Sequence, residues 1–66
     1  MKTIGRIIKD KRLEKGWTQA QLGEETGVTQ AAVFKWESGA TIPNALALMA
    51  LADAFECTIE ELCGRA

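Results

Sequence analysis

The chain has 66 residues, of which 47% are hydrophobic and 26% charged, and its 8 basic and 9 acidic residues give a net charge of -1. This composition is typical of a folded globular domain and excludes a disordered or collagen-like chain. A chain of this length buries only about 60% of the surface of its unfolded state, which leaves room for one modest core. We therefore expect a single domain over residues 1–66, without a deep cleft between domains.

The residue types that most catalytic and metal sites need are missing or few. The chain has no histidine, so a Ser-His or Cys-His catalytic pair is excluded, and we expect no enzyme. The two cysteines, Cys57 and Cys63, have too few companion ligands for a zinc site. We interpret both as reduced thiols that act as small apolar core residues, and we expect no metal, no cofactor and no small-molecule ligand.

No stretch of the sequence has the length of a membrane span or the apolar region of a signal peptide. The longest apolar run extends from Ala45 to Ala52, whereas a membrane-spanning helix needs roughly 20 such residues. Together with reduced cysteines, this pattern predicts a cytoplasmic protein that does not bind membranes.

Glycines and capping residues divide the chain into five segments with helical character. Four glycines follow such segments, where a left-handed residue commonly ends a helix: Gly16, Gly27, Gly39 and Gly64. Five residues that commonly cap helix N-termini precede the segments: Thr3, Thr18, Thr29, Asn44 and Thr58. Thr18 and Thr58 also have Gln21 and Glu61 three residues later, the capping-box pattern. The prediction is an all-α chain with helices over residues 3–15, 18–26, 29–37, 44–55 and 58–63.

Apolar residues at helical spacing predict which faces form the core. The clearest stripe lies in residues 44–55, and Trp17 is expected to fill the core from the connection between the first two helices. The expected core residues of the helices are Ile4, Ile8, Leu13, Leu22, Val33, Trp36, Leu48, Leu51, Ala52, Phe55, Ile59 and Leu62.

The short connection between the second and third helices is the most informative feature of the sequence. About three residues around Gly27 join the two helices, and so short a turn with a glycine makes them cross at a steep angle. Leu22 is placed to face inward, and Gly23 is small enough to allow a close approach of the third helix. This spacing predicts a helix-turn-helix unit in the second and third helices.

The chain here resembles the lambdoid phage repressor and Cro family, the XRE-type helix-turn-helix domains. The resemblance extends from Ile4 to Leu62 and is most specific in four stretches: residues 11–22, 27–30, 36–39 and 51–55. It implies a five-helix, lambda-repressor-like domain that binds double-stranded operator DNA sequence-specifically, usually as a homodimer on a two-fold site. It further implies a transcriptional regulator, in particular a repressor, that is bacterial or phage-encoded.

Four residues are placed on the outward side of the third helix and are expected to contact bases: Gln30, Ala31, Phe34 and Lys35. In a major groove, Gln30 suits adenine, which offers both a donor and an acceptor, and Lys35 suits guanine or a phosphate. The apolar Ala31 and Phe34 suit the methyl group of thymine.

Three residues are expected to contact phosphates: Gln19, Thr29 and Ser38. Gln19 opens the second helix, where free backbone N–H groups favour an anion, and the resemblance implies the same role. Thr29 and Ser38 flank the third helix. The resemblance also implies an interior salt bridge between Arg12 and Glu37 with a structural role.

The segment after the third helix departs from the family pattern, because residues 40–44 carry no positive charge. An apolar set follows it, Ile42, Leu46 and Met49, which we interpret as a possible two-fold dimer surface. The alternative is that these side chains are buried under the segment 39–44. The same features leave a second function open, a protein-interaction module of antagonist or antitoxin type with weak or no DNA binding.

Charge is distributed unevenly along the chain. Residues 1–15 hold six basic and two acidic residues, a net charge of +4, whereas residues 41–66 hold one basic and four acidic residues, a net charge of -3. The near-neutral total therefore does not exclude DNA, and it predicts a modest and strongly salt-sensitive binder.

Overall fold

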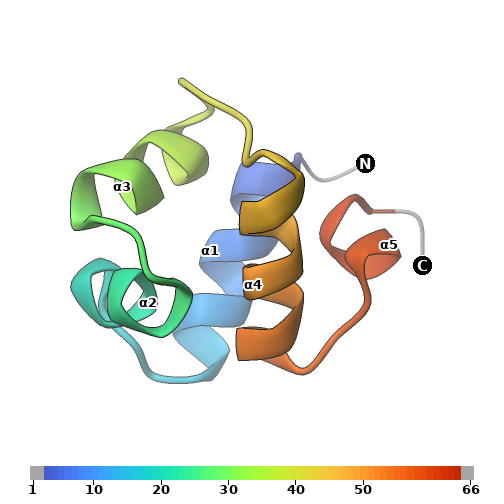
Figure 1. Cartoon of the computed structure of the whole chain (residues 1–66), viewed down its shortest axis with the longest axis horizontal. Helices are drawn as coiled ribbons and strands as arrows, with labels where there is room; N and C mark the ends of the chain where they lie inside the picture. Colours follow the sequence, from blue (N-terminus) through green and yellow to red (C-terminus); the bar gives the residue numbers. More distant parts are fainter. Residues whose placement is uncertain (1–2, 65–66) are drawn as a thin grey trace.

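The computed structural model describes residues 3–64, which form five helices and, over that range, no strand (Figure 1). The helices are α1 (Ile4–Glu14), α2 (Gln19–Thr26), α3 (Gln30–Ser38), α4 (Ala45–Phe55) and α5 (Ile59–Leu62). All five predicted helices are confirmed, and every predicted end lies within one residue of the observed end. None of the helices in the described range is long and apolar enough to cross a membrane.

The helices pack into a body of 26 × 24 × 22 Å. In the view of Figure 1, α2 and α3 lie on the left, α4 runs down the middle in front of α1, and α5 lies on the right. α3 packs against both α1 and α2, while α4 packs against α2 and α5. This arrangement supports α3 from behind and leaves its far side open to solvent.

The N-terminus of each helix is capped by the side chain that the sequence predicts. The side-chain oxygens of the five capping residues each accept the backbone N–H three residues later: Thr3, Thr18, Thr29, Asn44 and Thr58. At Thr18 the capping box is complete, because the Thr18 N–H also donates to Oε1 of Gln21 over 2.8 Å. At Thr58 only the hydroxyl half forms, since the Glu61 carboxylate is ion-paired with Lys11 Nζ at 3.6 Å.

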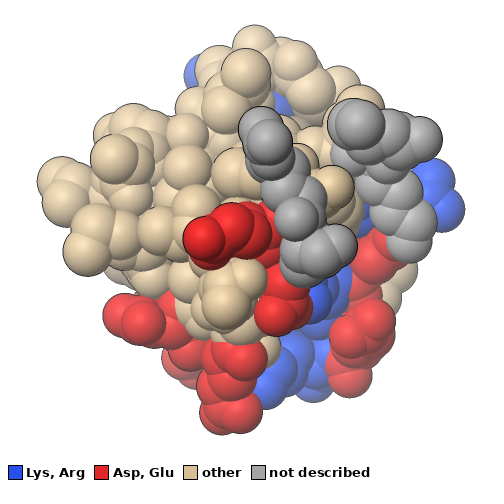
Figure 2. Space-filling model, turned by 90° about the vertical axis from the view of Figure 1, so that its right-hand side faces the viewer, with Lys and Arg blue, Asp and Glu red and all other residues tan. Residues whose placement is uncertain are grey.

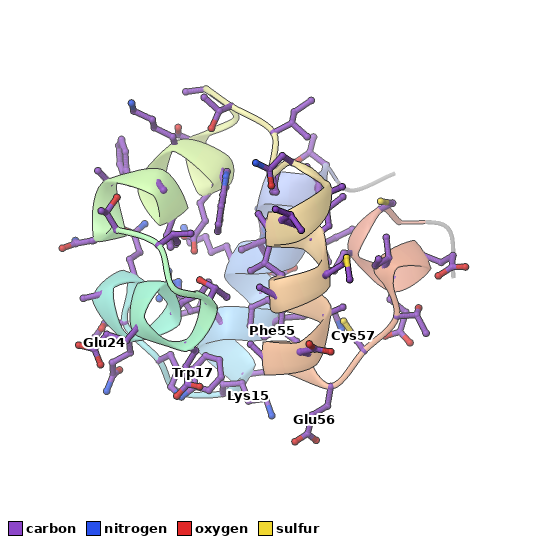
Figure 3. All side chains as sticks on the ribbon, in the orientation of Figure 1. Lys15, Trp17, Glu24, Phe55, Glu56 and Cys57 are labelled. Carbon is purple, nitrogen blue, oxygen red and sulfur yellow. The ribbon has the colours of Figure 1, made fainter. Side chains whose placement is uncertain are left out.

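The core combines residues from all five helices: Ile8, Leu22, Val33, Trp36, Leu51, Ala52, Phe55 and Leu62. The predicted contribution of Trp17 is confirmed, because its ring stacks on that of Phe55 with 6.1 Å between centroids (Figure 3). Ile4 and Leu48 also pack against this cluster and are partly buried, as expected.

The predicted core positions of Leu13 and Ile59 are wrong, because Leu13 is 56% exposed and Ile59 is exposed as well. In α1 the inward position one turn after Ile8 is taken by Arg12, which places Leu13 about 100° around the helix, on the solvent side. α5 has only four residues, about one turn, and Leu62 is its one buried residue, so Ile59 is left on the exposed side.

The two cysteines differ in their surroundings. Cys57 is half-buried against the core, and burial raises the pKa of its thiol despite the opposing charge of Lys11. The Cys57 thiol therefore keeps its proton at neutral pH. Cys63 is exposed, so its predicted core role is wrong, because it lies just beyond the last turn of α5.

Candidate functional site

The turn between α2 and α3 has the geometry of a helix-turn-helix unit. α2 ends at Thr26, and Gly27 caps it in the left-handed backbone conformation that the turn requires (φ 75°). The Val28 N–H donates to the Gly23 carbonyl oxygen over 2.9 Å, so the turn folds back onto α2. A Cβ atom on Gly23 would lie 2.7 Å from the Val28 carbonyl oxygen, which only glycine avoids. The predicted packing role of Gly23 is thus confirmed.

α3 has one buried side and one exposed side. Val33 and Trp36 are buried in the core and hold the helix in place, as the sequence predicts. The four residues expected to contact bases are all exposed, and together they form what we call the outer face of α3: Gln30, Ala31, Phe34 and Lys35. Phe34, a bulky aromatic residue, is 58% exposed. The structure therefore brings the predicted base-contacting set together on one accessible surface.

Arg12 and Glu37 form the expected salt bridge between α1 and α3. Arg12 Nε donates to Glu37 Oε2 over 2.7 Å, and the Arg12 Nη2 group donates to Oε1 over 3.1 Å. A third donor, Arg12 Nη1, is bound to the carbonyl oxygen of Trp17 at 2.8 Å. The side chains are only 10% and 5% exposed, so this two-point contact lies where solvent screens it little. It fixes α3 to α1 and to the start of α2.

Gln19 is attached to the same network. Its Nε2 group donates to Glu37 Oε1 over 3.2 Å, and the side chain is half-buried beside α3. Because a carboxylate only accepts hydrogen bonds, the NH2 end of the amide must face Glu37. One N–H of Gln19 and its carbonyl oxygen are left for a further partner. The sequence places Gln19 at the start of α2 but does not reveal this link to α3.

The other two expected phosphate contacts already serve the ends of α3. Thr29 Oγ1 accepts the Ala32 N–H over 3.2 Å and so caps the start of the helix. Ser38 Oγ donates to the Lys35 carbonyl oxygen over 3.1 Å at the other end. Both residues are exposed on either side of the outer face of α3. Their positions suit the predicted role, and a phosphate would have to compete with, or share, these local hydrogen bonds.

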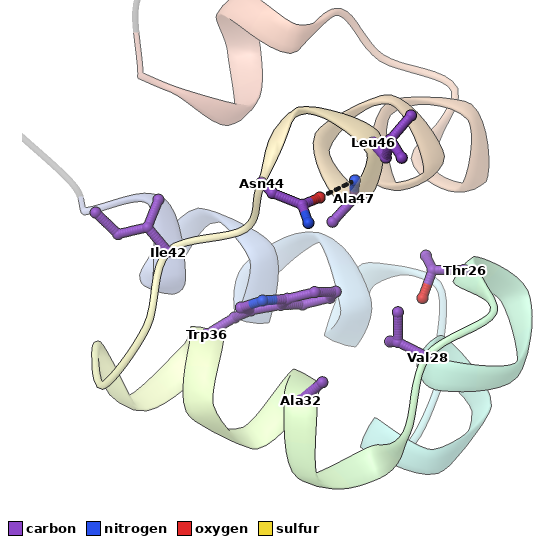
Figure 4. A pocket seen from close by; sticks show the side chains of 8 residues that line it. All are labelled: Thr26, Val28, Ala32, Trp36, Ile42, Asn44, Leu46 and Ala47. Atoms are coloured by element: carbon purple, nitrogen blue, oxygen red, sulfur yellow. Dashed lines mark hydrogen bonds between the residues drawn. The ribbon is translucent and has the colours of Figure 1, made fainter.

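The apolar set after α3 is exposed, so the alternative that segment 39–44 buries it is wrong. Ile42, Leu46 and Met49, called the α4 patch below, are between 55% and 77% exposed. Beside the patch lies an open groove of about 440 Å³ (Figure 4). Leu46 and Ala47 line it from α4, and Trp36 and Val28 line it from α3 and the turn. Ile42 lies at one end, on the segment before α4. The groove thus adjoins the helix-turn-helix unit.

The positive charge of α1 is largely neutralised within the molecule. Arg6 pairs with Asp10 at 3.2 Å, and Lys11 and Arg12 pair with Glu61 and Glu37. Figure 2 shows the α5 side, where acidic and basic side chains lie interspersed over the lower half and the upper part is mostly uncharged. Because of these ion pairs, the net charge of +4 over residues 1–15 overstates the positive charge available to a ligand. Lys2, which is counted in that charge, lies outside the described residues.

A family model described as helix-turn-helix matches residues 8–62 of this chain. The chain belongs to the helix-turn-helix family. This assignment agrees with the resemblance drawn from the sequence and with the turn geometry of α2 and α3.

Three curated relatives are named as repressors or activators. The chain is 46% identical over 48 residues to the cryptic phage CTXphi transcriptional repressor RstR of Vibrio cholerae, covering 73% of this chain and 43% of the relative. It is 40% identical over 55 residues to the transcriptional activator BcrR of Enterococcus faecalis, covering 83% and 27%. It is 36% identical over 59 residues to repressor protein C2 of Salmonella phage P22, covering 89% and 27%. The chain thus spans less than half the length of each of these relatives.

The fold is similar to solved structures of the P22 c2 repressor. One is a crystal structure of that repressor in complex with a synthetic operator, with a TM-score of 0.94 and 32% identity over 100% of both chains. Another is the solution structure of its DNA-binding domain, with a TM-score of 0.88 and 34% identity over 92% of this chain and 80% of that one. The five-helix, repressor-like fold expected from the sequence is therefore confirmed.

Proposed function

We propose that the chain is a sequence-specific DNA-binding transcriptional regulator, a repressor, that inserts α3 into the major groove. The observation that carries the proposal is the two-sided character of α3. Val33 and Trp36 fix it to the core, while the outer face of α3 remains exposed. A helix that is rigidly held yet open along one side is what major-groove recognition by this motif requires. Two of the three named relatives are repressors, both from phages, and one is an activator, which favours a repressor.

Each residue of the outer face of α3 has an assigned partner in the proposal. Gln30, the first residue of α3, pairs with adenine through its amide, and Lys35 donates to guanine or to a phosphate. Ala31 and Phe34 contact thymine methyl groups. Gln19, Thr29 and Ser38 contact phosphates on either side and set the position of α3 without reading sequence. This division predicts which substitutions change specificity and which change only affinity.

Salt-dependent binding to random-sequence duplex DNA tests the proposal. Each phosphate neutralised by the protein changes the slope of log K against log salt concentration by about -0.9. We expect a clearly negative slope for the wild-type chain, measured by fluorescence anisotropy with a labelled duplex. A slope near zero would instead favour the rival function, in which the fold serves only as a protein-interaction module.

We further propose that the α4 patch joins two copies of the chain on a two-fold operator. Its three side chains are large, apolar and exposed, and a surface of this kind on so small a domain is typical of an interaction site. The adjacent groove would receive apolar side chains of the second copy, because Trp36, Val28 and Ala32 line it. A contact here lies next to the helix-turn-helix unit and would hold two α3 helices at a fixed separation along DNA.

The double variant Leu46→Glu, Met49→Glu is expected to be monomeric under conditions in which the wild-type chain is dimeric. Two carboxylates placed in an apolar contact would have to lose their hydration without a partner. Sedimentation velocity measures the change, and circular dichroism verifies that the variant, altered only at exposed positions, keeps its helices. The variant Glu24→Gln, on the exposed side of α2, is the control and should sediment like the wild type (Figure 3). An equally dimeric double variant would rule out this surface.

A further inference from the structure

The lysine and arginine side chains of the described residues differ in whether they already have an ion pair or a ring contact within the protein. Residues 3–64 contain six: Arg6, Lys9, Lys11, Arg12, Lys15 and Lys35. Arg6, Lys11 and Arg12 are ion-paired. Lys15 Nζ lies over the ring of Trp17, 5.8 Å from its centroid. Within the described range, this leaves Lys9 and Lys35 as the two cations without an ion pair or ring contact.

Lys9 lies where three helices meet beside the outer face of α3. It lines a small hollow of about 170 Å³ together with Gln19 from α2 and Phe34, Glu37 and Ser38 from α3. The negative charge of Glu37 is already matched by Arg12, which is bound to both of its carboxylate oxygens. The hollow therefore has the net positive charge of Lys9.

Gln19, which also lines the hollow, has hydrogen-bonding capacity left. The Gln19 amide donates one N–H to Glu37 and keeps the other. An exposed lysine and an amide with a remaining N–H, lining one hollow, are complementary to an anion with several oxygen atoms, such as a phosphodiester. Because Phe34 belongs to both the hollow and the outer face of α3, a phosphate bound there would lie next to the bases that α3 contacts.

We infer that Lys9 binds a DNA backbone phosphate in this hollow and, with Gln19, sets the position of α3 in the groove. The inference rests on the proposed function and adds a contact from α1, which the sequence did not single out. Phosphate contacts fix the register of a protein on the duplex and carry no sequence information directly. Lys9 should accordingly contribute to affinity on any DNA sequence.

Lys9→Gln and Lys15→Gln form a matched pair of variants, since both remove one charge from an exposed lysine of the same region. Binding of the whole chain to a random-sequence duplex is measured over a range of salt concentrations. For Lys9→Gln we expect the slope of log K against log salt to become less negative by about 0.9, the change for one lost phosphate contact. Lys15→Gln should keep the wild-type slope, and Lys9→Arg should restore it.

The outcomes separate this inference from the proposed function. A negative wild-type slope that Lys9→Gln and Lys15→Gln change equally would overturn the role of Lys9 and leave DNA binding intact. A wild-type slope near zero would overturn both. Thermal melts verify that the variants are folded: Lys9→Gln should match the wild type, and Lys15→Gln, which loses the contact with the Trp17 ring, should melt slightly lower while its salt slope stays unchanged.

Discussion

Replacing Glu37 with alanine is expected to lower the free energy of unfolding by about 3–5 kcal/mol, because it leaves the Arg12 charge buried without a counter-ion. The pair is formed through two hydrogen bonds, and both side chains are almost completely shielded from water. The Gln19 amide also loses its acceptor in this variant. Urea denaturation followed by tryptophan fluorescence measures the change.

Two further variants show whether burial is the cause. Arg6→Gln breaks the exposed pair with Asp10 and should cost less than about 1 kcal/mol. Replacing both buried partners, as Arg12→Met with Glu37→Leu, should recover most of the loss, since no isolated charge remains. Recovery will be incomplete because the Trp17 carbonyl oxygen loses its donor. If Glu37→Ala unfolds completely, Glu37→Gln, which keeps a neutral acceptor, should still cost more than Arg6→Gln; an equal cost would contradict the role assigned to the pair.

Gln30→Ala is expected to lower affinity for the preferred DNA site by about 1–3 kcal/mol, which corresponds to roughly 5- to 150-fold. The loss arises because alanine offers neither the donor nor the acceptor that adenine requires. Affinity for random-sequence DNA should stay unchanged, since Gln30 has no charge and phosphate contacts dominate that binding. Competition between the two duplexes in one anisotropy assay measures the ratio directly.

Lys35→Gln is the informative comparison for this variant. Lys35 is positively charged and lies one turn further along the outer face of α3, so its loss should weaken binding to both kinds of DNA. A Gln30→Ala variant that lost affinity for both duplexes equally would contradict this role. It would show that the Gln30 contact strengthens binding to any DNA sequence and does not select a base.

Much of this fold could be predicted because its signals are local. Each capping residue lies three residues before the N–H that it accepts, so the sequence spacing alone fixes the contact. The turn at Gly27 is similar, since a short connection with a glycine restricts how two helices can cross. The outer face of α3 followed directly from the buried positions of Val33 and Trp36 on the other side.

Features that depend on contacts between distant residues were harder to predict. Leu13 is apolar and would be expected in the core. Arg12 takes the inward position instead, because its guanidinium group pairs there with Glu37, which is far away in the sequence. Glu61 fits the capping box of α5, but Lys11 from α1 takes its carboxylate. Gly5 lies within α1 although glycine is a poor helix former, because a Cβ atom at this position would collide with the Trp36 carbonyl oxygen of α3. In each case a partner from another helix decides the outcome.

The candidate site shows the same division. The outer face of α3 consists of residues of a single helix, so helical periodicity alone predicts that they lie on one side. The hydrogen bond from Gln19 to Glu37 and the position of Lys9 beside Phe34 depend on how α1, α2 and α3 pack together. Charge summed along the sequence likewise could not reveal that most cations of α1 are paired.

Selection of bound duplexes from a random-sequence DNA pool separates sequence recognition by α3 from any other use of this fold. With the wild-type chain we predict enrichment of sites whose two halves are related by a two-fold axis, with centres about 34 Å or a multiple of it apart. Each half should contain an adenine that the Gln30→Ala chain no longer selects. A pool that stays random after repeated rounds at low salt would contradict the proposal that the outer face of α3 reads bases.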